Sequence, residues 1–326
     1  MRDFQLPGRS AVFATNGLCA TSHPLAAQVA VQILQNGGNA VDAAIAAAVL
    51  LGICEPQSTG IGGDCFVLLK PAGEEKVVAL NGSGRGAAGL RADELRKRGM
   101  KEIPLYGPEA VTIPGAVDAF CRLSQDWGKI GLAASLAPAI HYAKAGIPVT
   151  PRTAFDWNVS QGVLSGVGKD FYLAGGKPLQ VGDIFRHPQQ ADVLRRIAKT
   201  GRAGFYEGEV AQDMVNSLNE LGGTHSLQDF ADTTCNYGDP ITGTYHGTDL
   251  IEHPPNGQGA TAILLANILS GFDIAGMDPF GTKRVHIEAE ATKLAYDARN
   301  RFIADPDHTS RLDHMLSMET ASKLAV

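Results

Sequence analysis

Ten residues near position 60 constrain the backbone of this chain more than any other stretch: Glu55-Pro56-Gln57-Ser58-Thr59-Gly60-Ile61-Gly62-Gly63-Asp64. Four of the ten are glycine or proline, and these adopt backbone conformations that other residues resist. The stretch follows a long apolar helix pattern and precedes an apolar strand pattern. It therefore predicts a tight turn. It lacks the Gly-Lys-Ser/Thr ending of a phosphate-binding loop, and no helix start follows it, so the sequence argues against nucleotide binding there.

Two helices are predicted before this turn. Ser22 is the expected N-cap of the first, with Pro24 in its first turn and apolar residues recurring every four positions. A glycine pair ends that helix. Asn39 then caps the second, with Asp42 at its third position, where a carboxylate interacts favourably with the helix dipole. This second helix, 40–51, is apolar on every side, so we expect it to be buried between layers.

Strands and helices follow in blocks along the rest of the chain. Residues 65–69 and 76–80 read as a hairpin, and their continuous apolar character predicts strands covered on both faces. The middle of the chain shows helix patterns that each end near a glycine, at 116–127, 132–145, 188–199 and 210–221. A second strand pair and two more helices follow, at 244–246, 249–252, 260–269 and 283–302.

This order of elements fits a layered α+β fold. We expect a single domain with three segments. Residues 1–115 would supply helices and core strands, residues 116–235 would be mostly helical, and residues 236–326 would hold the strand pair and the closing helices.

Composition narrows the function classes. The chain has 326 residues and a formal net charge of −6, so nothing in it suggests a nucleic-acid footprint. Its five cysteines are scattered without a CxxC pair, which indicates neither a metal site nor a disulfide framework. The N-terminus lacks the apolar core of a signal peptide, and the apolar run 40–54 is short for a membrane span. We expect a soluble, cytoplasmic chain without membrane contact, or a periplasmic or secreted one if a signal was removed.

Eight short motifs, in one order along the chain, carry a family resemblance. They are Thr21-Ser22-His23-Pro24-Leu25-Ala26, Gly37-Gly38-Asn39-Ala40-Val41-Asp42-Ala43-Ala44, the 55–64 stretch, Thr112-Ile113-Pro114-Gly115-Ala116-Val117, Phe205-Tyr206-Glu207-Gly208, Leu227-Gln228-Asp229-Phe230, Pro254-Pro255-Asn256-Gly257-Gln258-Gly259 and 288–299 with Asp305-Pro306 after it. Together they resemble the large subunit of the gamma-glutamyltranspeptidase family of N-terminal nucleophile (Ntn) hydrolases.

The resemblance implies a precursor that cleaves itself into a large and a small subunit, which share one αββα sandwich. The nucleophile is the new N-terminal Thr of the small subunit, and its own amine serves as the base. This chain therefore contributes no catalytic residue, metal ligand or cofactor site of its own. The implied partners are the small subunit and a small-molecule amide, with a dimer of heterodimers as a further assembly. The Thr-Thr-His start of a small subunit does not occur here, and Thr233-Thr234 lies too early.

The large subunits of this family offer one arginine that binds the alpha-carboxylate of the substrate, in an Arg-Glu-x-Ala-Pro context. The corresponding loop here reads Asn81-Gly82-Ser83-Gly84-Arg85-Gly86-Ala87-Ala88. An ungapped alignment places Ser83 at the arginine position, and Arg85 lies two residues later. Arg85 and Ser83 are the predicted substrate-binding residues, because a guanidinium matches a carboxylate in two hydrogen bonds. The alternative is a solvated loop arginine.

Other polar residues have simpler interpretations. His23 is read as a capping or packing residue rather than a catalytic one. His286 and Glu290 share a helix face, but no third metal ligand is evident, so an ordinary surface pair is favoured. The Asn256–Gly259 segment could present backbone N–H groups to an anion or simply begin a helix.

Three functions remain open at this level. The first is a gamma-glutamyl transferase or hydrolase acting on amides such as glutathione. The second is an amidohydrolase or acylase of the same family acting on another carboxylate amide, of the oxamate or cephalosporin type, which the shifted arginine favours. The third is a binding homologue without catalysis.

Overall fold

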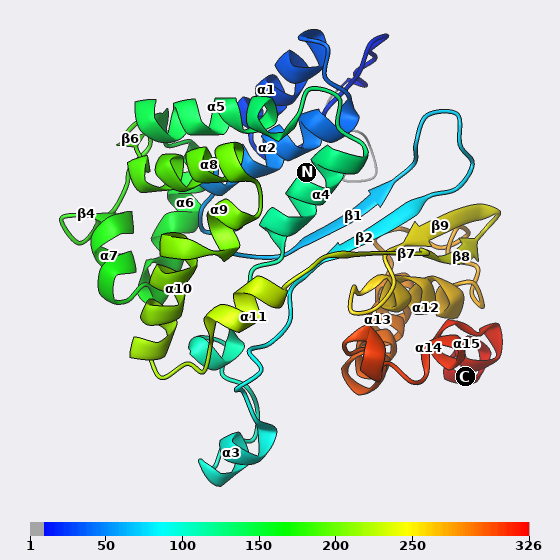
Figure 1. Cartoon of the computed structure of the whole chain (residues 1–326). Coiled ribbons are helices and arrows are strands. Elements are labelled where there is room, and N and C mark those ends of the chain that lie inside the picture. The colour runs from blue at the N-terminus through cyan, green and yellow to red at the C-terminus, as the bar shows by residue number, and fades with distance from the viewer. Residues whose placement is uncertain (1–9, 326) are drawn as a thin grey trace. The chain divides into compact units, whose positions relative to one another are not determined.

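The chain forms two compact units in the computed structural model, which describes residues 10–325. The helical unit comprises Val12–Cys65 and Gly82–Cys235, and the sheet unit is built mainly from Phe66–Asn81 and Asn236–Val326. Both are drawn in Figure 1. The expectation of a single three-segment domain stays a prediction.

The helical unit contains eleven of the α-helices of the described chain and two short hairpins. Its helices are α1 (Pro24–Gln35), α2 (Ala40–Cys54), α3 (Ala92–Lys97), α4 (Ala116–Asp126), α5 (Leu132–Ala145), α6 (Pro151–Ser160), α7 (Gly166–Tyr172), α8 (Pro188–Thr200), α9 (Ala203–Tyr206), α10 (Gly208–Glu220) and α11 (Leu227–Asp232). The hairpins pair β3 (Ile147–Pro148) with β6 (Ile184–Phe185), and β4 (Leu173–Ala174) with β5 (Lys177–Pro178). Short 3₁₀ turns lie at Pro108–Ala110 and Gln161–Val163.

Helix α2 is the centre of this unit. It packs against α1, α4 and α5, and α5 packs in turn against α8. Most of its side chains are buried, which confirms the prediction made from its all-round apolar sequence. The expected cap is also present, because Asn39 and Asp42 form a reciprocal capping box.

The predicted cap of α1 is wrong by one residue. His23, not Ser22, is the N-cap, and its Nδ1 accepts a hydrogen bond of 3.2 Å from the Leu25 N–H. The Ser22 hydroxyl instead donates to the Glu55 carboxylate at 2.6 Å. The ring nitrogen of histidine can accept at a helix start as a serine oxygen does, and the capping interpretation of His23 is confirmed.

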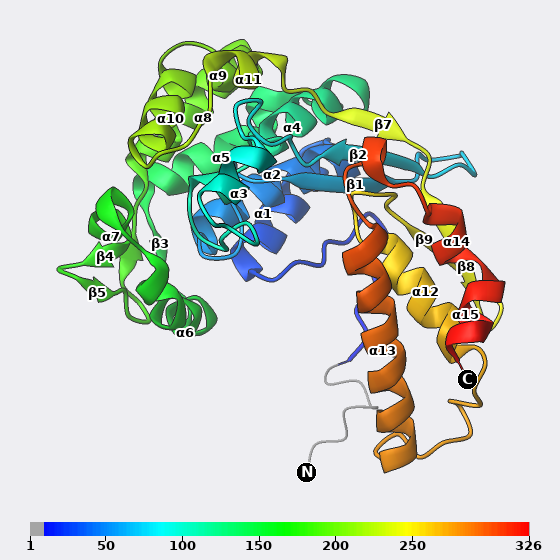
Figure 2. The same cartoon turned by 90° about the horizontal axis from the view of Figure 1, so that it is seen from below.

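The sheet unit combines short strands with four helices. Its strands are β1 (Cys65–Leu69), β2 (Val78–Gly82), β7 (Asn236–Gly238), β8 (Ile241–Tyr245) and β9 (Thr248–Glu252), and its helices are α12 (Gly259–Leu269), α13 (Thr282–Phe302), α14 (Leu312–Leu316) and α15 (Met318–Leu324), with a 3₁₀ turn at Pro306–His308. Strand β2 lies between β1 and β7, and β8 pairs with β9. Helix α12 packs on β8 and on α13, α14 and α15 (Figure 2).

The two predicted strand pairs are present, but one expectation about their cover fails. Strand β1 alternates between half-buried and exposed residues, with Phe66 39% and Leu68 42% exposed. Strand β2 is mostly buried, as expected. The described residues therefore leave one face of β1 uncovered, although its sequence is apolar on both faces. Among the described residues, no helix is long and apolar enough to cross a membrane.

Asp42 gives a test of this helical core. Its buried carboxylate accepts N–H groups of Asn39 at 2.9 Å, Lys129 at 3.0 Å and Ile130 at 3.4 Å. We expect Asp42→Ala to lower the free energy of unfolding by about 2–4 kcal/mol, because buried donors without acceptors cost roughly 1–3 kcal/mol each. Urea denaturation measures the loss. Asp93→Ala, at an exposed i,i+3 ion pair on α3, is the matched control and should be nearly neutral. An equal loss of unfolding free energy in both variants would contradict the stabilising role of the Asp42 carboxylate.

Candidate functional site

The predicted substrate-binding residues lie in one loop of the helical unit. We call residues 82–88 the Arg85 loop; it begins at the last residue of β2. Ser83 is half-buried and Arg85 is exposed. The structure therefore presents the Arg85 side chain to solvent on a loop that follows a strand, a common place for ligand contacts. That the two residues bind a substrate stays a prediction.

Glycines let this loop lie directly on another backbone segment. Gly84 has φ +75°, and a Cβ atom placed there would lie 1.7 Å from the Ile113 carbonyl oxygen. A Cβ at Gly115 would lie 2.3 Å from the Gly82 carbonyl oxygen. Only glycine fits such close approaches and the positive φ at position 84. The Ile113 N–H also donates to the Arg85 carbonyl oxygen at 2.8 Å. Residues 113–116, which we call the seat, thus fix the course of the loop.

The seat also holds the glycine-rich turn that dominates the sequence. The N–H groups of Gly115 and Ala116 both donate to the Gly63 carbonyl oxygen, at 3.0 and 3.1 Å. Three motifs that are separate in the sequence therefore meet in one place: the 55–64 turn, the Arg85 loop and the Pro-Gly start of α4. The predicted tight turn at 55–64 is confirmed as a series of turns between α2 and β1.

The far end of the Arg85 loop has a second attachment. The Ala88 N–H donates to Asp229 Oδ1 at 3.0 Å, while Asp229 Oδ2 accepts the Ser226 N–H at 2.8 Å and the Ser226 hydroxyl at 2.7 Å. Burial alone would raise the pKa of Asp229, but the hydrogen bonds from Ser226 and Ala88 hold that pKa below its usual value. The carboxylate is thus anionic at neutral pH and links α11 to the loop.

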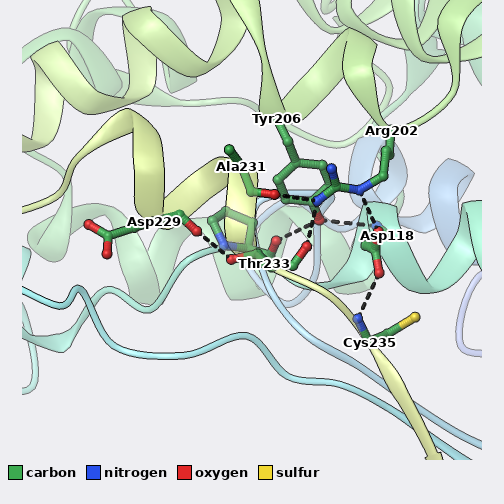
Figure 3. Close-up of polar contacts among 8 residues, drawn as sticks. Asp118, Arg202, Tyr206, Asp229, Ala231, Thr233 and Cys235 are labelled. Carbon is green, nitrogen blue, oxygen red and sulfur yellow. Dashed lines mark hydrogen bonds and ion pairs between the residues drawn. The ribbon is translucent and has the colours of Figure 1, made fainter.

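The buried hydroxyl of Tyr206 binds the backbone of the seat. Tyr206, at the end of α9, is 1% exposed. Its hydroxyl donates to the Pro114 carbonyl oxygen at 2.6 Å and accepts the Asp118 N–H at 3.0 Å. Burial, more than any neighbouring charge, raises the pKa of Tyr206 above its usual value, so the phenol keeps the proton that it donates. Figure 3 shows these bonds and the ion pair beside them.

That ion pair joins Asp118 to Arg202. The Arg202 Nε donates to Asp118 Oδ1 at 2.8 Å, and Asp118 Oδ2 accepts the Cys235 N–H at 2.7 Å (Figure 3). A terminal nitrogen of Arg202 also donates to the carbonyl oxygens of Ala231 at 3.3 Å and Thr233 at 2.5 Å. A charged pair with its hydrogen bonds satisfied avoids the large cost of an unpaired buried charge.

Four of the cysteines are not activated as nucleophiles. Burial raises the pKa of Cys54, Cys121 and Cys235 to about 12, with neighbouring carboxylates adding to the effect, and raises that of Cys65 to about 11. These four thiols keep their protons at neutral pH, whereas the thiolate is the reactive form.

The remaining candidates have ordinary surroundings. The described residues contain no cluster of three or more His, Cys, Asp or Glu side chains that could hold a metal, and Glu290 pairs with Lys293 at 2.9 Å. In the sheet unit, the Asn256 side chain accepts from Asn81 at 2.8 Å, and Gln258 accepts from Arg299 at 3.0 Å. The segment leads into α12, as the helix-entry interpretation predicted; an anion-binding role stays a prediction.

Sequence reasoning missed the groups that hold the loop. It identified the motifs that contain Tyr206 and Asp229, but it assigned no holding role to either residue and no role to Asp118 or Arg202. One signal was available. Asp118 lies on the buried face of an amphipathic helix, between Val117 and Ala119, and a carboxylate in that position needs donors. The identity of its partner, 84 positions away, has no local signal.

Comparison with known proteins places this geometry in one family. Residues 26–326 match the family described as Gamma-glutamyltranspeptidase. The Glutathione hydrolase-like YwrD proenzyme of Bacillus subtilis is 33% identical over 96% of this chain and 60% of its own length. The Oxamate amidohydrolase proenzyme of Klebsiella pneumoniae is 33% identical with the same coverage, 96% and 60%. The cephalosporin acylase structure from Bacillus halodurans matches with a TM-score of 0.89 and 37% identity, over 99% of this chain and 62% of that one. The chain thus spans about three fifths of each of these three proteins.

The glycine contacts give a second test. Gly84→Ala would place a methyl group against the Ile113 carbonyl and force a side chain onto φ +75°, so we expect a stability loss of at least ~2 kcal/mol. Gly86→Ala is the matched control two residues on, because its Cβ would meet nothing within 4 Å among the described residues. Thermal denaturation of both variants checks the difference. If Gly84→Ala melts with the wild type, the loop does not lie on the seat.

Proposed function

The chain belongs to the gamma-glutamyltranspeptidase family, and we propose that it is the large subunit of an N-terminal nucleophile amidohydrolase that acts on a carboxylate-bearing amide. The similarity to the cephalosporin acylase structure, with a TM-score of 0.89, also shows the Ntn-hydrolase fold of the family. The chemistry, substrate and partner in this proposal rest on the family and on the site described above.

The single observation that carries the proposal is the geometry of the Arg85 loop. Its backbone is attached to the seat through Ile113 and to α11 through Asp229, while the Arg85 side chain is exposed. An attached backbone avoids the cost of ordering the loop when a ligand binds, so that only the side-chain torsions of Arg85 remain to be ordered, which favours affinity. The planar guanidinium can donate two parallel hydrogen bonds to a carboxylate, which a lysine ammonium cannot do. The hydroxyl of Ser83, on the same loop, would provide an additional hydrogen bond.

The proposed partner is a small subunit that carries the nucleophile. The YwrD and oxamate amidohydrolase relatives are both named proenzymes, and the chain spans 60% of the length of each. One face of the edge strand β1 is apolar and uncovered by the described residues, at Phe66 and Leu68. Exposed apolar strands at a sheet edge are the usual place for another chain to pair. A small subunit that pairs with this edge and packs a layer on the exposed face would bury both side chains.

The reaction then follows the logic of N-terminal nucleophiles. The Thr hydroxyl adds to the amide carbonyl while the free α-amine takes its proton. Donors on the small subunit stabilise the oxyanion. The amine returns the proton to the departing nitrogen, so the C–N bond breaks and an acyl ester forms. Water or an acceptor amine then attacks the ester and frees the Thr. In this scheme Arg85 holds the substrate carboxylate during every step.

Two substrate classes fit the site. A gamma-glutamyl amide such as glutathione is the first, because it defines the family. A shorter carboxylate amide is the second, and the specific observation in its favour is Arg85 itself, two residues past the position of the family arginine, where Ser83 stands. The relative named Oxamate amidohydrolase proenzyme and the one named Glutathione hydrolase-like YwrD proenzyme are both 33% identical to the chain.

Arg85 is tested directly in the complete, processed enzyme. We expect Arg85→Ala to raise KM for carboxylate-bearing amides, at little change in kcat, by the equivalent of roughly 1.5–3 kcal/mol for a charge-assisted hydrogen bond. Neutral amides of the same shape should keep their KM. Steady-state kinetics on such a matched pair gives the measurement.

A conservative variant sharpens this test. Arg85→Lys keeps the positive charge but loses the fork, so it should recover part of the lost binding and not all of it. Arg91→Ala, at another exposed arginine a few residues on, is the control for a general loss of positive charge. If Arg85→Ala leaves KM unchanged for carboxylate and neutral amides alike, the binding role of Arg85 is wrong.

A substrate panel separates the two classes. We expect hydrolysis of gamma-glutamyl anilide if the acyl chain is long, and of oxamate-type amides if the carboxylate lies next to the amide. Comparing kcat/KM for the two at equal pH decides between them, because this ratio reports differential binding of the transition state. Turnover of neither compound by the processed enzyme would favour a binding homologue.

A further inference from the structure

We propose that Tyr206 and Asp229 are positioning residues that hold the two ends of the Arg85 loop and thereby set the carboxylate affinity of the enzyme. The inference rests on the proposed function, since it deepens the role of Arg85 in substrate binding. Neither residue is expected to touch substrate, and both act through backbone groups of the loop or of its seat.

Tyr206 itself is held in one orientation. Its ring is buried, Phe205 contacts it edge-on with ring centroids 5.0 Å apart, and the Arg202 guanidinium lies 4.8 Å from its ring centroid. Arg202 is in turn fixed by Asp118 and by the carbonyl oxygens of Ala231 and Thr233. The hydroxyl therefore has a set position, from which it reaches one acceptor and one donor of the chain near the start of α4 (Figure 3).

The hydroxyl acts on the segment that carries the loop. It binds the Pro114 carbonyl, and the flanking residues Ile113 and Gly115 are the ones that contact Arg85 and Gly82. Gly115 and Ala116 also bind the Gly63 carbonyl. A displacement of Pro114 therefore moves the support of the Arg85 loop and of the 55–64 turn together. These contacts join backbone to backbone, so no flexible side chain can absorb such a movement.

Replacement by phenylalanine isolates this effect. The ring of Phe would keep its packing against Phe205 and Arg202, and the Asp118–Arg202 pair would still tie α4 to α9. What changes is that the Pro114 carbonyl loses its hydroxyl donor and the Asp118 N–H its acceptor. Buried backbone groups without partners shift toward other partners or toward water. The predicted consequence is a loosened seat in a folded protein.

Asp229 secures the other end of the loop. Its Oδ1 accepts the Ala88 N–H, three residues after Arg85, and a Cβ at the adjacent Gly89 would lie 2.8 Å from the Thr224 carbonyl oxygen. The chain on both sides of Arg85 is therefore attached within the helical unit. Asp229→Asn would turn one carboxylate oxygen into an N–H₂ donor, so the side chain could no longer accept from both Ala88 and Ser226. Asp232→Asn makes the same carboxylate-to-amide change at an exposed residue of α11 whose carboxylate accepts from Gln228 at 2.7 Å, and it is the matched control.

The experiment measures steady-state kinetics of the complete processed enzyme on a carboxylate amide and its neutral analogue. Tyr206→Phe and Asp229→Asn should each raise KM for the carboxylate amide about tenfold, the equivalent of ~1.4 kcal/mol. Values of kcat, and KM for the neutral amide, should stay within about twofold, because the nucleophile is not attached to this loop. Tyr142→Phe, a hydroxyl deletion on α5, and Asp232→Asn should leave the carboxylate preference unchanged. Hydrogen exchange in residues 111–118 should speed up in Tyr206→Phe only.

Each outcome decides the inference. If Tyr206→Phe and Asp229→Asn lose stability but keep the wild-type KM for both amides, the two residues are merely structural and the inference is overturned. An equal rise in KM for both amides overturns it as well. Should Tyr206→Phe fail to fold, the comparison of Asp229→Asn with Asp232→Asn determines whether the loop ends set the carboxylate affinity. Arg85→Ala, measured in parallel, reports on the proposed function separately: if it does not change KM, the carboxylate site itself is wrong.

Discussion

The direct contact of two backbone segments is the constraint on which the candidate site depends. The Arg85 loop lies on residues 113–116 at distances that leave no room for a Cβ at Gly84 or Gly115. Backbone atoms cannot change rotamer, so such a contact fixes position more firmly than side-chain packing does. The 55–64 turn joins the same segment through Gly63. The glycines between the predicted helices and strands are thus the residues at which these backbone segments contact one another.

The polar groups behind this contact keep it in one arrangement. Asp118, Arg202 and Tyr206 satisfy one another and several backbone groups, and a buried network of this kind tolerates few alternatives. An apolar replacement could be as stable as an ion pair. It would, however, leave the Cys235 N–H and the carbonyl oxygens of Ala231 and Thr233 without their present partners. The main effect of the network is therefore to fix the positions of these backbone groups, rather than to raise the free energy of unfolding.

Local chemistry predicted much of the fold and little of the site. The two ends of α5 and the cap at Asn39 are determined by residues within one helical turn of each other. These features could therefore be predicted from the sequence. The cap of α1 was misplaced because Ser22 and His23 can both accept, and only the distant Glu55 takes the Ser22 hydroxyl. Strand β7 and the Asp118–Arg202 pair were not predicted, since each depends on a partner more than 80 positions away. Arg85 and Ser83 came from a family resemblance, which supplies the long-range information that periodicity lacks.

The position of Arg85 links the backbone geometry to the choice of substrate. In an extended strand, residues 83 and 85 would point to the same side, and an arginine could move by two positions with little effect. Gly84 lies between them at φ +75°, however, so the chain is not extended there. The alternation that would place residues 83 and 85 on one side is therefore interrupted at Gly84. In the proposed function, a carboxylate bound by Arg85 would lie at a different place from one bound at position 83. In the proposed function the amide would still have to reach the same nucleophile, so a substrate with a different distance between carboxylate and amide would suit such a site.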